Sequence, residues 1–98
     1  MTNTRRMSEL ESVTQQRLIE TLRRQGWMVV KNNLCSVPGF PDLTAIRGGR
    51  VVFVEVKRPN GRTRPLQDHV HKQIREHGGV VVTYDGGILP KELKDEED

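Results

Sequence analysis

The chain has 98 residues, the length of one compact domain, so we expect a single domain over residues 1–98. Only 34% of the residues are hydrophobic and 4% aromatic, which leaves a thin core. The single cysteine, the absence of a signal-peptide-like N-terminus and the absence of a long apolar stretch argue against a disulfide scaffold, a secreted protein and a membrane protein. We therefore expect a cytoplasmic location.

The formal charge of +3 is unevenly distributed, because residues 91–98 contain five acids and two lysines. The rest of the chain has 14 basic and 8 acidic residues, a net charge of +6. A domain with this positive charge is suited to bind a polyanion such as nucleic acid, since each phosphate neutralised by Lys or Arg releases condensed counterions. A basic surface that only confers solubility explains the charge equally well. Charge is thus compatible with nucleic acid without identifying it.

The first expected element is a helix from about residue 8 to residue 25, a stretch without Gly or Pro that stops at Gly26. Its apolar residues recur near helical spacing, at Leu10, Leu18, Ile19 and Leu22. Residues 27–30 predict a short strand, and residues 31–41, with their Asn, Pro and Gly, predict a loop. Residues 1–7 are expected to be flexible.

Residues 42–46 and 51–57 are expected to form an antiparallel hairpin around the turn Arg47-Gly-Gly-Arg50. The strand over residues 51–57, the third along the chain, begins apolar on both faces, which is typical of a strand in the middle of a sheet. Glu55 and Lys57 extend a face that starts as core, where unpaired charges are costly. A simple ion pair at the strand end is the structural alternative to a functional site.

After a polar turn, a second helix is expected over residues 65–77, where Gly78-Gly79 ends it. A fourth strand over residues 80–84 and one helical turn near residues 90–93 follow. The end of the acidic tail, residues 94–98, is expected to be flexible. The order α-β-β-β-α-β predicts an α/β domain with a mixed central sheet flanked by helices.

The hairpin brings a second carboxylate to Glu55. Asp42 opens the strand over residues 42–46, and the turn folds this strand back beside the end of the strand over residues 51–57, where Glu55 and Lys57 lie. Two hard oxygen ligands on adjacent strands suit Mg²⁺ or Mn²⁺, with waters and a substrate phosphate completing the coordination. The lysine can position or help deprotonate an attacking water and offset charge on the phosphate. Asp42, Glu55 and Lys57 are therefore candidate catalytic residues.

Glu11 is the candidate third acidic ligand. Projected at about 100° per residue, it falls between Leu18 and Leu22 on the apolar stripe of the first helix. Glu9 and Glu20 project away from that stripe. A glutamate on the apolar side of a helix is unusual unless it faces a site. The alternative is a first-turn glutamate that reaches solvent and is favoured by the helix dipole.

Basic residues near the expected strand ends are candidate phosphate contacts: Arg58, Arg62 and Arg64 after the third strand, and Lys31 in the first loop. A solvated basic loop is the alternative interpretation for each of them. His69, His71 and His77 are separated by two and six residues, which does not place two imidazoles on one helical face. We interpret them as surface or packing residues, and Trp27 as a core residue.

Pro41-Asp42, followed after twelve residues by Glu55-Val56-Lys57, resembles the PD-(D/E)xK nuclease signature, which that superfamily carries on a strand hairpin. The finer pattern is similar to the VRR-NUC (virus-type replication-repair nuclease) branch in Gly39-Phe-Pro-Asp-Leu43, Gly49 to Arg58, Gly61-Arg62, Pro65-x-Gln67 and Gly78-Gly79. The resemblance extends from Glu11 to Tyr84. Phe40 departs from the pattern, which more often has an aliphatic residue there.

The resemblance implies a restriction-endonuclease-like core and metal-dependent hydrolysis of DNA. It implies that Mg²⁺ or Mn²⁺ is held by Glu11, Asp42, Glu55 and the backbone carbonyl of Val56. It also implies that Lys57 acts on the water and that Gln67 lies near the catalytic site. The short chain resembles stand-alone phage or bacterial members, which implies a homodimer that acts on branched DNA, such as four-way junctions, in a bacterium or a phage-infected host cell. A dimer would also bury surface that the thin core cannot.

The main alternative is a non-catalytic DNA-binding or assembly module that keeps the nuclease fold. Inactive relatives typically lose a metal ligand, and this sequence keeps every candidate. An RNA-directed or non-specific nuclease stays open, because nothing in the sequence recognises sugar chemistry or base sequence. We predict a structure-selective, metal-dependent DNA endonuclease in which water attacks the phosphodiester in line.

Overall fold

The computed structural model describes residues 2–94, and the side chains from Leu10 onward. Its elements are, in chain order, α1 (Thr2–Arg24), β1 (Met28–Lys31), β2 (Leu43–Arg47), β3 (Arg50–Val56), α2 (Pro65–Glu76), β4 (Val80–Tyr84) and the 3₁₀ turn η1 (Lys91–Leu93). The predicted α/β class and the predicted order of elements are confirmed. Apart from the start of α1, the boundaries agree with the expected ones to within one residue.

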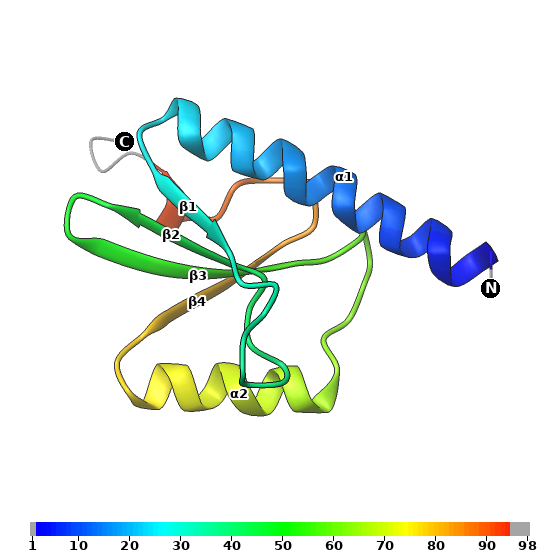
Figure 1. The fold of residues 1–98 in the computed structure, drawn as a ribbon. Helices are drawn as coiled ribbons and strands as arrows, with labels where there is room; N and C mark the ends of the chain where they lie inside the picture. Colours follow the sequence, from blue (N-terminus) through cyan, green and yellow to red (C-terminus); the bar gives the residue numbers. More distant parts are fainter. Residues whose placement is uncertain (1, 95–98) are drawn as a thin grey trace.

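A single four-stranded sheet in the order β1-β2-β3-β4 lies between the two helices, with α1 over one face and α2 over the other (Figure 1). β1, β2 and β3 pair antiparallel, whereas β4 pairs parallel to β3. The parallel pair requires a crossover, and α2 provides it. β3 is therefore an inner strand covered on both sides, as its apolar residues on both faces predict.

The β2–β3 hairpin turns at Gly48 and Gly49, whose φ angles are +58° and +80°. Two successive residues in the left-handed region make the tight turn that matches the twist of the flanking strands, and glycine adopts that region without steric cost. The resulting register pairs Leu43 with Val54. Asp42, one residue before Leu43, is thereby placed beside Glu55, one residue after Val54.

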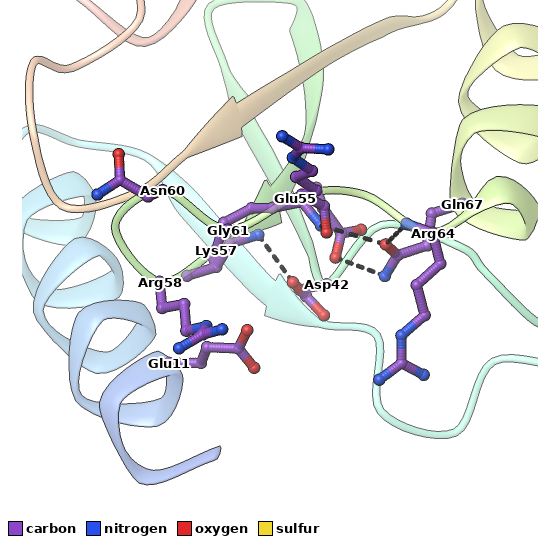
Figure 2. Close-up of a pocket in the computed structure, with 11 residues that line it drawn as sticks. Glu11, Asp42, Glu55, Lys57, Arg58, Asn60, Gly61, Arg64 and Gln67 are labelled. Carbon is purple, nitrogen blue, oxygen red and sulfur yellow. Dashed lines mark hydrogen bonds between the residues drawn. The ribbon is translucent and has the colours of Figure 1, made fainter. Parts of the chain in front are cut away.

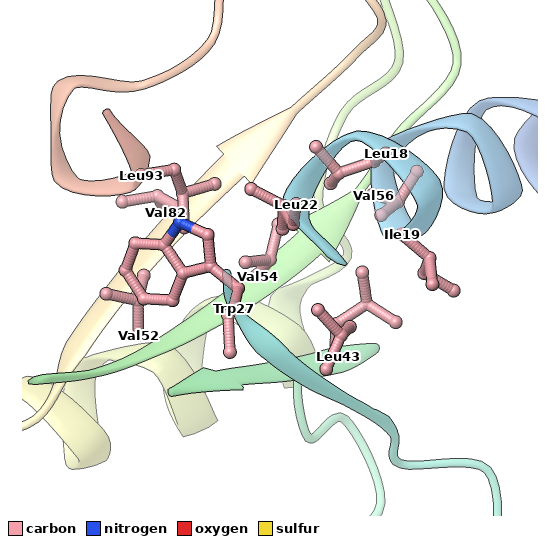
Figure 3. Packing of buried hydrophobic residues seen from close by; sticks show 12 residues of the cluster. Leu18, Ile19, Leu22, Trp27, Leu43, Val52, Val54, Val56, Val82 and Leu93 are labelled. Carbon is pink, nitrogen blue, oxygen red and sulfur yellow. The ribbon is translucent and has the colours of Figure 1, made fainter. Parts of the chain in front are cut away.

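The hydrophobic core lies between α1 and the sheet (Figure 3). Its buried members are Leu18, Ile19, Leu22, Trp27, Val29, Leu43, Ala45, Val52, Val54, Val56, Val82 and Leu93. Alternation along β3 explains the arrangement, because the valines at even positions face α1 while Phe53 and Glu55 lie on the face toward α2. The core therefore backs the same strand that carries the candidate site.

Trp27 is buried, as the sequence predicts, and it explains the two arginines that flank the hairpin turn. The guanidinium of Arg47 lies 4.5 Å from the ring centroid of Trp27, and that of Arg50 lies 5.4 Å from it. Both distances suit cation–π contacts. Arg47 and Arg50 thus close this end of the core, opposite the end of the sheet where the candidate site lies.

α1 begins at Thr2, six residues earlier than expected, because the segment 2–7 contains no Gly or Pro that would stop a helix. Leu10 was expected on the apolar stripe, but its side chain is 51% exposed. The N-terminal part of α1 extends beyond the strands (Figure 1), so the sheet does not cover Leu10. The expected flexibility of residues 1–7 and 94–98 stays a prediction, and Met1 and residues 95–98 lie outside the described residues. Within residues 2–94, neither helix has the length and apolar character needed to cross a bilayer.

Candidate active site

A pocket of about 600 Å³ opens where β2 begins and β3 ends, between the N-terminal half of α1 and the start of α2 (Figure 2). It gathers nearly all of the predicted site residues, together with two more from the loop after β3: Glu11, Asp42, Glu55, Val56, Lys57, Arg58, Asn60, Gly61, Arg62, Arg64 and Gln67. Lys31 is the exception, because its exposed side chain lies at the end of β1 and does not line this pocket. The structure therefore brings together acids and bases from four separate segments.

Asp42 is held in place by the main chain and by an asparagine. The backbone N–H of Val56 donates to Oδ2 of Asp42 at 2.8 Å, which ties the carboxylate to β3. The backbone N–H of Asn32 donates to the carbonyl oxygen of Asp42 at 2.8 Å, and the side-chain amide of Asn32 donates to the carbonyl of Pro41 at 3.0 Å. The sequence did not predict this contact of Asn32 with the Pro41-Asp42 segment. Asn32 fixes the Pro41-Asp42 segment from the neighbouring strand end.

Glu55 is buried, with 3% of its surface exposed, on the face of β3 that α2 covers. The side-chain amide Nε2 of Gln67 donates to its Oε2 at 3.0 Å. The pKa of Glu55 is raised to about 8, first by burial and then by the neighbouring Asp42 carboxyl, while Lys57 opposes the shift. Two carboxyl groups that share a site cannot both ionise at ordinary cost. In the absence of a cation, the pair therefore keeps a proton near neutral pH.

Lys57 is linked to Glu55 through Gln67. The Lys57 ammonium donates to Oε1 of Gln67 at 3.2 Å and to the backbone carbonyl of Arg62 at 3.1 Å. Oε1 of Gln67 also accepts the backbone N–H of Arg64 at 2.9 Å, which caps the start of α2. Gln67 is therefore hydrogen-bonded to Glu55, to Lys57 and to Arg64, the N-cap residue of α2. Gln67 lines the pocket, and its catalytic role stays a prediction.

His71 is a site residue that the sequence interpretation missed. Its side chain is 3% exposed, and its Nε2 lies 3.4 Å from Oε1 of Glu55. Burial, followed by the nearby charge of Arg75, lowers the pKa of His71, so the ring is neutral at pH 7. The signal was available, because His71 follows Gln67 by four residues and so shares its helical face. His69 and His77 are exposed, as expected of surface residues.

Glu11 reaches into the pocket from α1, on the side opposite α2 (Figure 2). Its side chain is exposed, and its charge adds to the causes that raise the pKa of Glu55. Among the described side chains, no three His, Cys, Asp or Glu residues lie close enough to form a metal cluster. Glu11 therefore stands at the rim of the pocket, apart from the close pair of Asp42 and Glu55.

The donor set fits a hard divalent cation such as Mg²⁺. This ion keeps several waters and is usually bound by only one or two carboxylates, which Asp42 and Glu55 provide. Oε1 of Glu55 is buried without a hydrogen-bond partner among the described residues. The side chain of Val56 packs in the core, so Val56 borders the pocket through its main chain. A cation between the carboxyl groups would stabilise their ionised forms.

Gly39 lets the loop before Asp42 approach α2. Its φ is +83°, and a Cβ there would lie 3.0 Å from Cγ and 3.1 Å from the carbonyl oxygen of Leu66. We expect Gly39→Ala to lower the free energy of unfolding by about 1–3 kcal/mol, because the alanine adds backbone strain and a clash with Leu66. Denaturant unfolding measures the loss. The matched control is Gly48→Ala, whose φ is also positive but whose Cβ would meet nothing within 4 Å; equal losses in the two variants would contradict the role of the Leu66 contact.

Phe40, the residue that departs from the family pattern, packs edge-on against Phe53 with 5.3 Å between the ring centroids. The pair lies on the sheet face toward α2. The aromatic side chain at position 40 therefore has a structural explanation, and it does not alter the placement of Asp42.

Comparison with protein-family models and with curated proteins found no match. The mixed sheet, the crossover helix and the pocket of acids and bases at the strand ends define a nuclease-type α/β domain. A solved structure described as a VRR-NUC domain matches with a TM-score of 0.69 and 30% sequence identity, over 78% of this chain and 85% of that one. The chain belongs to the VRR-NUC family, and the resemblance inferred from its sequence is confirmed.

Proposed function

We propose that the protein is an endonuclease that uses a divalent metal to hydrolyse phosphodiester bonds of DNA. The observation that carries the proposal is the convergence of Asp42, Glu55 and Lys57 in one pocket bordered by arginines. Membership of the VRR-NUC family supports nuclease activity. The partly buried pair of carboxyl groups, which a divalent cation would allow to ionise together, supports the dependence on metal.

In this proposal Asp42, Glu55 and the backbone carbonyl of Val56 hold Mg²⁺ or Mn²⁺, and Glu11 approaches from the rim as a third acid. When bound, the ion supplies positive charge at the phosphate and lowers the pKa of water. The hydrogen bonds to Asp42 and Glu55 orient both carboxylates before substrate arrives. The remaining chemistry falls to Lys57 and to the basic loop that follows it.

Lys57 is positioned to act on the attacking water or on the phosphate. Among the described residues, Gln67 and Arg62 accept two of its three N–H bonds, so the third can face the pocket. An ammonium held in this way needs little reorganisation when negative charge develops on the phosphate. The arginines at positions 58, 62 and 64 border the same pocket, where they would bind the phosphates on either side of the cut.

We extend the proposal to branched DNA and to a dimer. Two copies related by a two-fold axis would present two pockets to a four-way junction, whose arms have matching symmetry. The thin core supports this extension, since a second copy would cover apolar side chains that are exposed in the single chain, among them Met28, Val30 and Leu34. Sedimentation of the free protein measures the oligomeric state directly.

The activity is tested with labelled four-way junction, duplex and single-stranded DNA in Mg²⁺, Mn²⁺ or EDTA. We expect the wild type to cut with either metal, to prefer the junction and to be inactive in EDTA. Lys57→Ala should bind DNA but cut about a hundredfold more slowly or worse, because it loses the group that acts on the water and the phosphate. Gel-based cleavage rates and binding by electrophoretic shift measure the two effects separately.

Lys72→Ala is the matched control, because Lys72 is an exposed lysine on α2 that does not line the pocket. Cutting in EDTA, or equal rates for the Lys57 variant and the wild type, would reject the mechanism. Binding without any cutting by the wild type would favour a non-catalytic module instead. Equal rates on junction and duplex would remove only the selectivity for branched DNA.

A further inference from the structure

α2 presents two side chains to the two oxygens of Glu55. Gln67 donates to Oε2 at 3.0 Å, and Nε2 of His71 faces Oε1 at 3.4 Å. Residues four apart lie on the same face of a helix, so one face of α2 covers the whole carboxyl group. This face continues the site beyond the residues that the mechanism above uses.

The contact between His71 and Glu55 is enclosed. Both side chains are 3% exposed, and among the described residues neither Nε2 of His71 nor Oε1 of Glu55 has a hydrogen-bond partner. Their separation of 3.4 Å lies near the upper limit for a hydrogen bond, and a rotation of either side chain would be needed to complete one. Buried polar atoms are nearly always bonded, and these two atoms face each other.

We propose that His71 is a positioning residue, whose Nε2–H holds Oε1 of Glu55 while Gln67 holds Oε2, so that α2 fixes the direction in which this carboxylate binds the divalent cation. The inference rests on the proposed function, since it concerns the same metal site. Carboxylates that bind metals are commonly oriented by hydrogen bonds from a surrounding layer of residues, and loss of such a bond lowers metal affinity or activity by about 10–100-fold. A residue that only filled space here would need no nitrogen, because burying an imidazole without a bond is costly.

His71→Gln and His71→Met separate positioning from packing. In glutamine the donor nitrogen stands as many bonds from Cβ as Nε2 does in histidine, and methionine has the same length without a donor. We expect the affinity for Mn²⁺, measured by titration calorimetry without DNA, to fall about 10–100-fold in His71→Met and to be largely restored in His71→Gln. The metal concentration for half-maximal cutting should shift in parallel.

His69→Met is the matched control, because His69 lies on the same helix and is exposed. Circular dichroism and unfolding in EDTA confirm that each variant folds, and His71→Phe replaces the methionine variant if that one does not. Wild-type affinity in the apolar variant, or equal losses in the glutamine and methionine variants, would show that His71 only packs. A wild type that neither binds Mn²⁺ nor cuts DNA would instead overturn the proposed function, and this inference with it.

Discussion

Glu55→Gln is expected to abolish cutting and, in metal-free buffer, to make the folded protein more stable above pH 8. The pKa of Glu55 is about 8 in the folded protein and 4.5 in its ordinary state. Between these values the unfolded chain has lost the proton that the folded chain keeps, so the free energy of unfolding falls as the pH rises. The full penalty, on the order of a few kcal/mol, is present above pH 8. Glutamine has no charge to bury, so the Glu55→Gln variant avoids this penalty.

Denaturant unfolding in EDTA at pH 5, 7 and 9 measures this effect. We expect the wild type to lose stability steadily across this range, and Glu55→Gln to lose much less. Cutting should fall at least about a thousandfold, because in the proposed mechanism Glu55 holds the cation, and a neutral amide in its place removes several kcal/mol of transition-state stabilisation. Glu76→Gln, which changes an exposed acid near the end of α2, should behave like the wild type in both assays. The same pH dependence in wild type and Glu55→Gln would contradict the burial of a costly charge.

Leu22→Ala is expected to produce the largest loss of stability. The Leu22 side chain is fully buried between α1 and the sheet, at 0% exposure. Emptying such a position costs about 2–5 kcal/mol, against a total of about 5–15 kcal/mol for a domain of this size. Thermal and denaturant unfolding should both show the loss. The loosened α1 also carries Glu11, so cutting should weaken at temperatures where the fold still persists.

Leu10→Ala is the matched control on the same helix, because its side chain is 51% exposed. We expect it to change the free energy of unfolding by less than about 0.5 kcal/mol. Similar losses in the two variants would mean that α1 is not held to the sheet by the core that Leu22 belongs to.

The centre of the candidate site was predictable because local rules produce it. Gly48 and Gly49 specify the tight turn, alternation assigns each side chain of β3 to a face, and the register then brings Asp42 to Glu55. None of these steps needs knowledge of distant parts of the chain. The predicted juxtaposition of the two carboxyl groups follows from the hairpin alone.

The surroundings of the site were harder to predict, because they depend on how the elements dock. Asn32 looks like any polar loop residue until β1 pairs with β2 and brings it to Pro41. His71 reaches Glu55 only when α2 packs over that side chain. Leu10 follows the helical period correctly, but the sheet does not reach far enough to cover it. Each of these outcomes is set by tertiary geometry that periodicity does not contain.

Apart from Glu11 and the Asn32 anchor, the groups that meet at the pocket come from one contiguous stretch, from Asp42 to His71. Partners so near in sequence close only short loops, and the chain entropy lost on closing a loop grows with its length. Local contacts of this kind also favour rapid folding. We therefore expect the candidate site to assemble together with the hairpin and its crossover helix, without waiting for α1 to dock.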